Sequence, residues 1–365
     1  RDHLTIRWSA DEVWKTVREF AGLPPETARE RFRLGPDARD WKVHLAQASV
    51  RESGPTRDHL RRILYRPFDV RWTYYTAQSR GFLCKPRGKV MRHMIEGENL
   101  GLSTTRSIEI GRGWEHVFCT REMIQHHTVS IKEVNYLFPL YLYPKNRDEV
   151  DDLEEWGARE AAAEYGGRRR PNLDPTLMDE LARRLKMAFI EAGTGDLTKT
   201  FGPENVFHYV YAVLHSPSYR ARYAEFLKRD FPRVPFTSKA RLFRALCAHG
   251  ARLVQLHLLE ASPQGGFLYP EPGHNTVDTP RYVAAQGRVY INQTQYFEGV
   301  AEDVWNFHIG GYQVCEKWLK DRKGRALDYE DIARYISILG VLTETLALMK
   351  DIDAAIMKDG GWPLG

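Results

Sequence analysis

The sequence lacks the features that define several large classes of protein. It has only four cysteines in 365 residues and no Cys-x-x-Cys pair, so neither a zinc site nor a disulfide framework is predicted. No apolar run approaches the roughly 20 residues that a transmembrane helix needs, and no signal-peptide pattern opens the chain. We therefore expect no membrane association and a reducing cytoplasmic location.

Catalytic signatures are missing as well. No GxxxxGK[ST] loop is present, which excludes the common nucleotide-hydrolysing motors. The Asn-Pro-Pro-aromatic loop of adenine methyltransferases is absent, as is a glycine-rich loop for a methyl donor. His126 and His127 are adjacent, and neighbouring residues on a strand point to opposite faces, so they do not form a metal-ligand pair. We predict no catalytic residue, no metal and no cofactor in this chain.

Positive charge is concentrated in one short segment. The whole chain carries a formal net charge of +5, yet residues 57–92 hold ten basic residues against Asp58 and Asp69. The rest of the chain is therefore slightly acidic. Such a concentration favours a polyanionic partner over a generally basic surface. A solvated face that pairs with acidic loops elsewhere is the alternative.

Helical and extended patterns alternate along the chain, which predicts an α+β fold. Residues 9–52 read as helices, with Ser9 as N-cap and Glu12 three places on, a further start at Pro24-Pro25 and a third at Pro36. Short aromatic and β-branched segments between residues 60 and 144 read as strands, with one helix near residues 89–95. More helices are expected at about 175–193, 203–215, 217–229, 238–260 and 301–307, strands at 281–300, and a long apolar-striped helix at 329–357.

These patterns divide the sequence into five parts. Residues 1–55 are a helical connector and residues 56–144 a β-rich lobe. Residues 145–174 are acidic and then basic and contain Gly and Pro, which is typical of a linker. Residues 175–326 are a second α+β part, and residues 327–365 are a helical support. The opening Arg1-Asp2, with no Met, leads us to expect a segment of a longer protein.

Residues with the chemistry to contact nucleic acid gather in the β-rich lobe. YRPFDVRWTYYT (65–76) interleaves arginines with aromatic rings, although Asp69 offers Arg66 or Arg71 an internal ion pair instead. KPRGKVMRHM (85–94) is a basic turn that runs into a helix. Hydroxyl groups and further arginines follow downstream. The predicted DNA-contacting set is Arg66, Arg71, Lys85, Arg87, Lys89, Arg92, Ser103, Thr104, Thr105, Arg106, Thr120 and Arg121.

One protein family shares the residues of these segments as well as their spacing. FHYVYAVLHSPSYRARYAEFLKRDFPRVPF (207–236) predicts two helices folded back on each other, with a turn at Ser216-Pro217. Together with YRPFDVRWTYYT, GENLGLSTTR, HVFCTR, NYLFPLYLYP, RVYINQTQYFEGV and IGGYQVCEKWLKDRKGRALDYEDI, it occurs in the same order over nearly the whole chain. The sequence thus resembles the C-terminal specificity region of type ISP restriction-modification enzymes and related fused adenine-specific methyltransferase-endonucleases.

The resemblance implies a target-recognition domain for double-stranded DNA. Residues 56–144 would be the recognition lobe, and residues 1–55 the connector from a methyltransferase domain. The parent protein would combine adenine-N6 methylation with ATP-dependent cleavage in a prokaryotic cytoplasm, using S-adenosylmethionine, ATP and Mg²⁺ outside this segment. Its methyltransferase and motor domains would be partners of this chain. The alternative is a structural module that clamps those domains without reading DNA itself.

Overall fold

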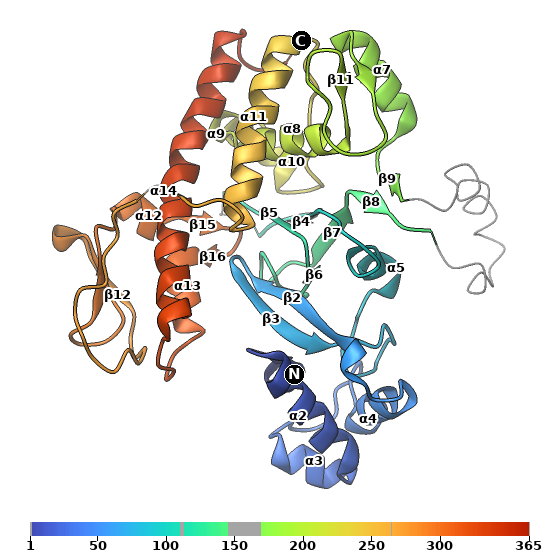
Figure 1. Ribbon diagram of the computed structural model, residues 1–365, viewed down its shortest axis with the longest axis vertical. Helices are drawn as coiled ribbons and strands as arrows, with labels where there is room; N and C mark the ends of the chain where they lie inside the picture. Colours follow the sequence, from blue (N-terminus) through green and yellow to red (C-terminus); the bar gives the residue numbers. More distant parts are fainter. Residues whose placement is uncertain (1, 110–112, 145–168, 264, 365) are drawn as a thin grey trace. The chain divides into compact units, whose positions relative to one another are not determined.

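The computed structural model describes residues 2–109, 113–144, 169–263 and 265–364 (Figure 1). It divides into two compact units. Unit 1 comprises Arg1–Asn99 and Arg121–Gln125, and unit 2 comprises Leu100–Thr120 and His126–Gly365. Several small sheets and a long C-terminal helix confirm the predicted α+β class. Most of the predicted linker at 145–174 lies outside the described residues.

Unit 1 joins short helices to a four-stranded sheet of order β1-β3-β2-β6. β2 and β3 form an antiparallel hairpin, β1 is antiparallel to β3, and β6 is parallel to β2. The strands are β1 (Ile6–Arg7), β2 (Leu60–Arg66), β3 (Asp69–Tyr74) and β6 (Met123–Ile124). The helices are α1 (Asp2–Thr5), α2 (Ala10–Gly22), α3 (Pro25–Arg31), α4 (Val43–Glu52) and α5 (Gly88–Met91), with 3₁₀ turns η1 (Arg57–His59) and η2 (Arg92–Met94).

The opening helices begin largely where capping chemistry places them. Ser9 Oγ accepts a hydrogen bond from the Glu12 amide at 3.2 Å, which confirms the predicted N-cap of α2. The third helix begins at Val43 and not at Pro36, because the Asp37 carboxylate accepts from the Val43 amide at 3.1 Å and the segment between them forms a turn. The helices are not isolated, since their apolar faces share one buried core with the hairpin. That core includes Val13, Val17, Phe20, Val43, Val50, Leu60, Tyr74 and Phe82.

Unit 2 begins with a three-stranded antiparallel sheet in which β4 lies between β5 and β7. Two-stranded pairs β8–β9, β10–β11 and β15–β16 and the sheet β12-β13-β14 follow. The strands are β4 (Gly101–Thr105), β5 (Val117–Thr120), β7 (Asn135–Pro139), β8 (Tyr141–Leu142), β9 (Arg170–Pro171), β10 (Ala188–Phe189), β11 (Thr200–Phe201), β12 (Arg281–Val283), β13 (Arg288–Tyr290), β14 (Tyr296–Glu298), β15 (His308–Ile309) and β16 (Tyr312–Gln313).

Helices fill the rest of unit 2. They are α7 (Pro175–Leu185), α8 (Pro203–His215), α9 (Pro217–Arg222), α10 (Ala224–Leu227), α11 (Ala240–His257), α12 (Glu302–Trp305), α13 (Val314–Lys320) and α14 (Tyr329–Lys358), with a 3₁₀ turn η5 (Ala284–Gln286). The predicted helical hairpin at 207–236 is present as α8 followed by α9, and Ser216 Oγ caps α9 by accepting from the Tyr219 amide at 3.1 Å. The second arm is shorter than predicted, because the chain leaves the helix at Tyr223 before α10.

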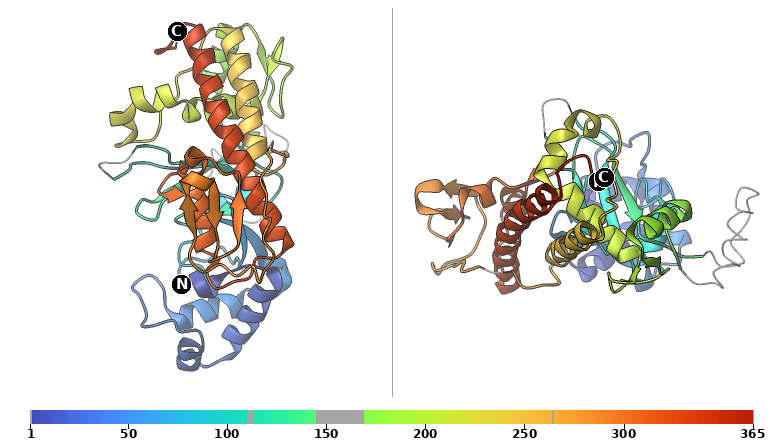
Figure 2. Two further views of the ribbon diagram at one scale, coloured as in Figure 1. Left: turned by 90° about the vertical axis from the view of Figure 1, so that its left-hand side faces the viewer. Right: turned by 90° about the horizontal axis from the view of Figure 1, so that it is seen from above.

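The long C-terminal helix α14 lies alongside α11 in Figures 1 and 2, and an ion pair between Arg252 and Glu344 at 2.6 Å joins the two. By length and composition alone α14 could cross a membrane, but 44% of its most apolar window is buried inside this fold. Core helices of water-soluble proteins share that property. Gly250 on α11 allows close helix packing, since a Cβ there would lie 1.8 Å from the His208 carbonyl oxygen of α8.

Candidate nucleic-acid interface

A basic pocket opens in unit 1 beside the loop that joins β3 to α5. Its volume is about 590 Å³, and we call it the basic pocket. Four cationic side chains and one carboxylate line it. The lining residues are Asp40, Ser79, Arg80, Cys84, Lys85, Arg87, Gly88, Lys89 and Val90. Three of the twelve predicted contact residues, namely Lys85, Arg87 and Lys89, are thus brought together around one concave surface.

The loop that carries these cations is fixed by its own buried residues. Phe82 is fully buried, its amide donates to Ser49 Oγ at 3.3 Å, and its carbonyl accepts from Trp41 Nε1 at 3.2 Å. Tyr75 donates its hydroxyl hydrogen to the Pro86 carbonyl at 3.1 Å. Burial raises the pKa of Tyr75 to about 12, so this hydroxyl keeps its proton and remains a donor. Anchors at both ends therefore hold the loop while its charged side chains stay at the surface.

Two of the pocket arginines have an unusual backbone conformation. Arg80 has φ of +60° and Arg87 has φ of +52°, in the left-handed region that non-glycine residues seldom adopt. Each such residue costs on the order of 1–3 kcal/mol and persists only where the surroundings fix it. Arg87 is also the residue before α5, which has only four residues. Backbone amides at the start of so short a helix contribute little, and the pocket depends on side-chain charge.

The electrostatic balance of the pocket is positive. Lys85 Nζ lies 3.8 Å from a carboxylate oxygen of Asp40, and Arg39 Nε lies 3.3 Å from the other. The hydrogen bond from Arg39 and its charge lower the pKa of Asp40, with smaller contributions from Lys85 and Arg80, so this carboxyl stays ionised. One anion cannot neutralise four lining cations. The surplus charge favours an anionic ligand with several acceptor oxygens.

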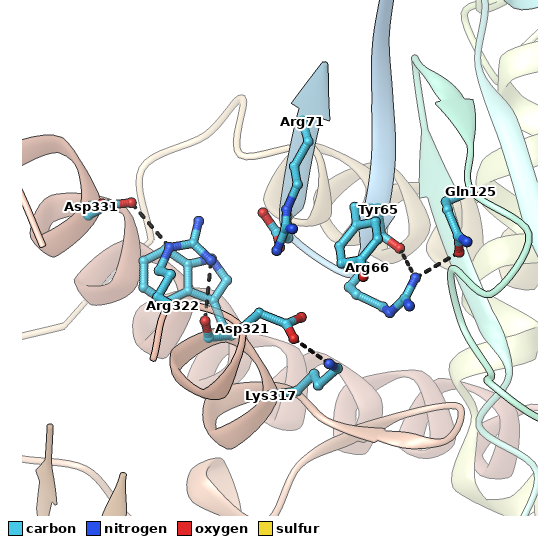
Figure 3. Close-up of polar contacts among 10 residues, drawn as sticks. Tyr65, Arg66, Arg71, Gln125, Lys317, Asp321, Arg322 and Asp331 are labelled. Atoms are coloured by element: carbon cyan, nitrogen blue, oxygen red, sulfur yellow. Dashed lines mark hydrogen bonds and ion pairs between the residues drawn. The ribbon is translucent and has the colours of Figure 1, made fainter. Parts of the chain in front are cut away.

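The predicted arginines of the β2–β3 hairpin lie inside unit 1. Arg71 is buried, with its guanidinium 2.7 Å from Asp69 and 3.9 Å from the centre of the Tyr65 ring. The internal Arg–Asp pair that the sequence left open is therefore formed. Arg66 is also buried, and its Nη1 donates to Gln125 Oε1 at 2.7 Å and to the Tyr65 carbonyl at 2.6 Å (Figure 3). Both side chains brace the hairpin in this structure.

The predicted hydroxyl residues are buried within the first sheet of unit 2. Ser103, Thr104 and Thr105 are at most 1% exposed on β4, and Thr120 is buried on β5. Thr104 Oγ1 donates to the His116 carbonyl at 2.7 Å. A hydroxyl enclosed in this way reaches a DNA base only if the sheet opens. In this structure the four hydroxyl residues are enclosed by the fold and do not form part of an accessible surface.

The remaining predicted residues are more accessible. Arg92 forms an ion pair with Glu96 at 3.1 Å within one helical turn. Arg106 is largely exposed and lies 3.1 Å from Asp230. Arg121 is exposed at the start of the short segment that returns to unit 1. Exposed ion pairs of this kind are weak, so their cations can exchange partners at low cost.

Sequence reasoning missed the two other charged members of the pocket, Arg80 and Asp40. Arg80 belongs to the basic segment, but it lies in an irregular loop between two recognisable motifs. Asp40 precedes the basic segment and is separated from it by α4, so no spacing rule links it to Lys85. In the described part of the chain no group of three or more His, Cys, Asp or Glu residues is placed to hold a metal ion. The pocket is thus a cationic surface without a metal-ligand set.

Similarity to solved structures covers almost the whole chain. A DrdV–DNA complex matches with a TM-score of 0.65 and 21% identity, over 96% of this chain and 34% of that one. The ATP-dependent type ISP enzyme LlaBIII bound to DNA matches with a TM-score of 0.62 and 15% identity, over 96% of this chain and 22% of that one. A nuclease-deletion mutant of the type ISP enzyme LlaGI, in complex with a DNA substrate mimic, matches with a TM-score of 0.61 and 16% identity, over 96% of this chain and 27% of that one. At these identities the likeness shows a shared fold, and this chain spans between 22% and 34% of each neighbour.

Comparison of sequences identifies the family. No curated protein gives a significant match to the chain. The family defined as the type ISP C-terminal specificity domain matches residues 1–351. That range spans both units, from the helices before the basic pocket to the C-terminal half of α14. The chain therefore belongs to the type ISP C-terminal specificity domain family, as its sequence motifs predicted.

Proposed function

We propose that this chain recognises a specific sequence in double-stranded DNA on behalf of a restriction-modification enzyme. Recognition places the target adenine for N6-methylation and sets where cleavage is licensed. The observation that carries the proposal is the basic pocket of unit 1, a fixed concave surface with four lining cations against one carboxylate. Lysine and arginine on such a surface hold phosphate oxygens, and phosphate contacts fix the register in which bases are read.

Family membership and fold give the proposal its biological setting. The three structural neighbours named above were all solved with DNA or a DNA mimic. We infer that methyl transfer, ATP hydrolysis and strand cleavage belong to other domains of the same polypeptide. S-adenosylmethionine, ATP and Mg²⁺ would serve those domains, which are also partners of this chain in a prokaryotic cytoplasm. This chain would itself perform no catalysis.

Charge reversal in the pocket tests the proposal. Arg87→Glu with Lys89→Glu replaces two lining cations by anions, and neither side chain is buried. We expect the full chain to fold normally and to lose affinity for a short duplex, measured by fluorescence anisotropy. Lys15→Glu is the matched control, because Lys15 is exposed on α2 and does not line the pocket. Equal duplex affinity for the wild-type chain and the double variant would refute the proposal.

Sequence reading needs a separate measurement in the parent enzyme. Long-read sequencing of methylated genomic DNA gives the recognition motif, and repeating it with altered pocket residues separates two roles. Loss of methylation at an unchanged motif indicates phosphate anchoring, whereas a changed motif identifies a base reader. Retention of full methylation by the Arg87 and Lys89 variant would contradict both roles.

The alternative of a structural clamp rests on the apolar stripe of the C-terminal helix and on the helical connector at residues 1–55. In the structure Leu339, Leu342 and Ile352 of that stripe are fully buried. The apolar surface of these three side chains is thus covered within the fold, whereas Ile332, Ile336, Leu346 and Met349 of the same stripe remain partly exposed. The basic pocket therefore makes DNA recognition the function that the described residues favour.

A further inference from the structure

A second surface with nucleic-acid chemistry lies on unit 2, outside the basic pocket. β7 is an edge strand whose residues alternate between buried and exposed. Tyr136 and Phe138 point outward and remain 39% and 42% exposed. Phe231, from the segment after α10, contacts both, with ring centroids 5.0 Å from Tyr136 and 5.4 Å from Phe138. We call these three residues the aromatic patch.

Exposed aromatic rings are unusual on an edge strand, and the fold does not require them. An outward-facing strand position usually carries a polar side chain, and charged residues commonly protect an exposed edge. Two large rings, side by side on the same face, instead leave about two fifths of their surface uncovered. The Phe231 ring stands nearly perpendicular to both, at 83° and 88°. It therefore holds the two rings by edge contacts and does not lie flat over them.

Three arginines lie close to Phe231, two of them as near neighbours in the sequence and one through an ion pair with Asp230. Arg106 pairs with Asp230 at 3.1 Å, and Asp230 immediately precedes Phe231. Arg229 and Arg233 flank the same short segment and are exposed, and neither forms an ion pair within the described ranges. The backbone amide of Phe231, followed by Arg106, lowers the pKa of Asp230, so this carboxyl is an anion. Arg229 also acts on Glu225, which pairs with Lys228 at 2.7 Å. Three arginines and one lysine against two carboxylates leave the rim positive.

From this juxtaposition we propose that the aromatic patch stacks an unpaired or extruded base of DNA, with Arg106, Arg229 and Arg233 on the adjoining phosphates. Proteins that bind single strands combine aromatic stacking platforms with a positive groove along the backbone. Sheet-borne aromatics that stack bases are a recurring form of this arrangement. The inference rests on the proposed function in taking DNA as the partner, but it assigns a different surface and a different state of the nucleic acid.

The aromatic patch could instead bind another protein, but the positive charge of its rim favours DNA. Cores of protein interfaces are depleted in charged residues, and a rim of one sign needs an acidic counterpart. DNA supplies that counterpart at every nucleotide, with bases of the size and flatness that exposed rings accept. A patch that served protein docking would be unaffected by whether a base is paired, which is the property that the experiment measures.

The test uses the full chain with two probes of the same sequence, a matched duplex and the corresponding single strand. Phe138→Leu keeps an apolar side chain against Phe231 but removes the aromatic face. We expect its affinity for the single strand to fall about 5- to 150-fold, the range for loss of one stacked base, with duplex affinity unchanged. Phe138→Trp should restore single-strand binding. Phe226→Ala is the matched control, because Phe226 is 75% exposed nearby but lies outside the patch.

The outcomes separate this inference from the proposed function. If the wild-type chain binds the duplex but Phe138→Leu binds the single strand as the wild type does, the patch is not a stacking site. If the wild-type chain binds neither probe, DNA recognition by this chain fails as well. If Phe138→Leu leaves both DNA affinities unchanged and instead makes the parent enzyme more susceptible to limited proteolysis, the patch docks protein and the inference is overturned.

Discussion

Neutralising two cations of the basic pocket should change how strongly DNA binding depends on salt. The double variant Arg87→Ala, Lys89→Ala removes two of the four cations that line the pocket. Both side chains are accessible and lie outside the buried core, so the fold should be preserved. The change therefore isolates the contribution of counterion release, because each phosphate contact displaces condensed cations from DNA.

The magnitude follows from the number of contacts. If all four lining cations contact phosphates, they contribute a slope of about −3.6 to the logarithm of affinity against the logarithm of salt concentration, since each contact contributes about −0.9. Between about 50 and 200 mM salt this corresponds to a loss of about 150-fold in affinity. With two contacts left, the slope falls to about −1.8 and the loss to about 12-fold.

The measurement is a series of duplex-binding titrations at increasing salt for wild-type chain, double variant and the Lys15→Ala control. The control should keep the wild-type slope, because its side chain lies outside the pocket. A double variant that binds more weakly at every salt concentration with an unchanged slope would refute the reasoning. Such a result would mean that the pocket shapes the fold and does not hold phosphates.

Three further predictions concern the stability of the fold. Asp69→Ala should lower the free energy of unfolding by about 3–5 kcal/mol in urea titrations, because it leaves the buried guanidinium of Arg71 without its carboxylate; a loss below about 1 kcal/mol would show that the stacked rings suffice. Thr104→Val removes a buried hydrogen bond to a carbonyl and should cost about 1–3 kcal/mol. The isosteric Thr105→Val should cost nothing, because that buried hydroxyl has no partner among the described residues; equal costs would contradict the difference in bonding. Burial, with a smaller effect of a nearby arginine, lowers the pKa of His257 to about 3 from 6.5. The unfolded chain therefore binds more protons as pH falls through this range, stability is retained above about pH 6.5 and lost below it, and at pH 5 the loss is about 2 kcal/mol. Burial also lowers the pKa values of His208 and His215, so the wild-type chain should lose more than this between pH 7 and pH 5. Unfolding of His257→Gln at the two pH values should show a loss smaller by about 2 kcal/mol.

Element types could be predicted from the sequence because local signals determine them. Ser9, Ser216 and Pro217 mark helix starts whose capping bonds depend on only a few neighbouring residues. The long apolar stripe gave the C-terminal helix almost to the residue. Prediction was less accurate where a competing local bond decides the boundary, as at Asp37, whose carboxylate caps a helix that begins six residues later.

The candidate site was predicted only in part, because residue type does not determine burial. Arg71 and Lys89 are both cations in the same basic segment, yet one stacks on Tyr65 inside unit 1 and the other lines the pocket. The alternation of β7 was visible in NYLFP, but exposure of its rings depends on Phe231, nearly a hundred positions away. Pairings between distant segments lie beyond what spacing in a single sequence can specify.

In the loop between β3 and α5, different residues fix the backbone and present side chains to a ligand. Phe82, Pro86 and the hydrogen bonds from Trp41 and Tyr75 fix its path. The side chains at positions 79, 80, 85 and 87, with position 89 at the start of α5, line the pocket and are not part of the buried core. Substitutions at the second set alter the ligand-facing chemistry while the first set preserves the backbone. New ligand preferences can therefore arise by exchange of side chains alone at positions 79, 85 and 89, which makes these three the natural ones for a randomised library. Positions 80 and 87 are more restricted, because their backbone lies in the left-handed region.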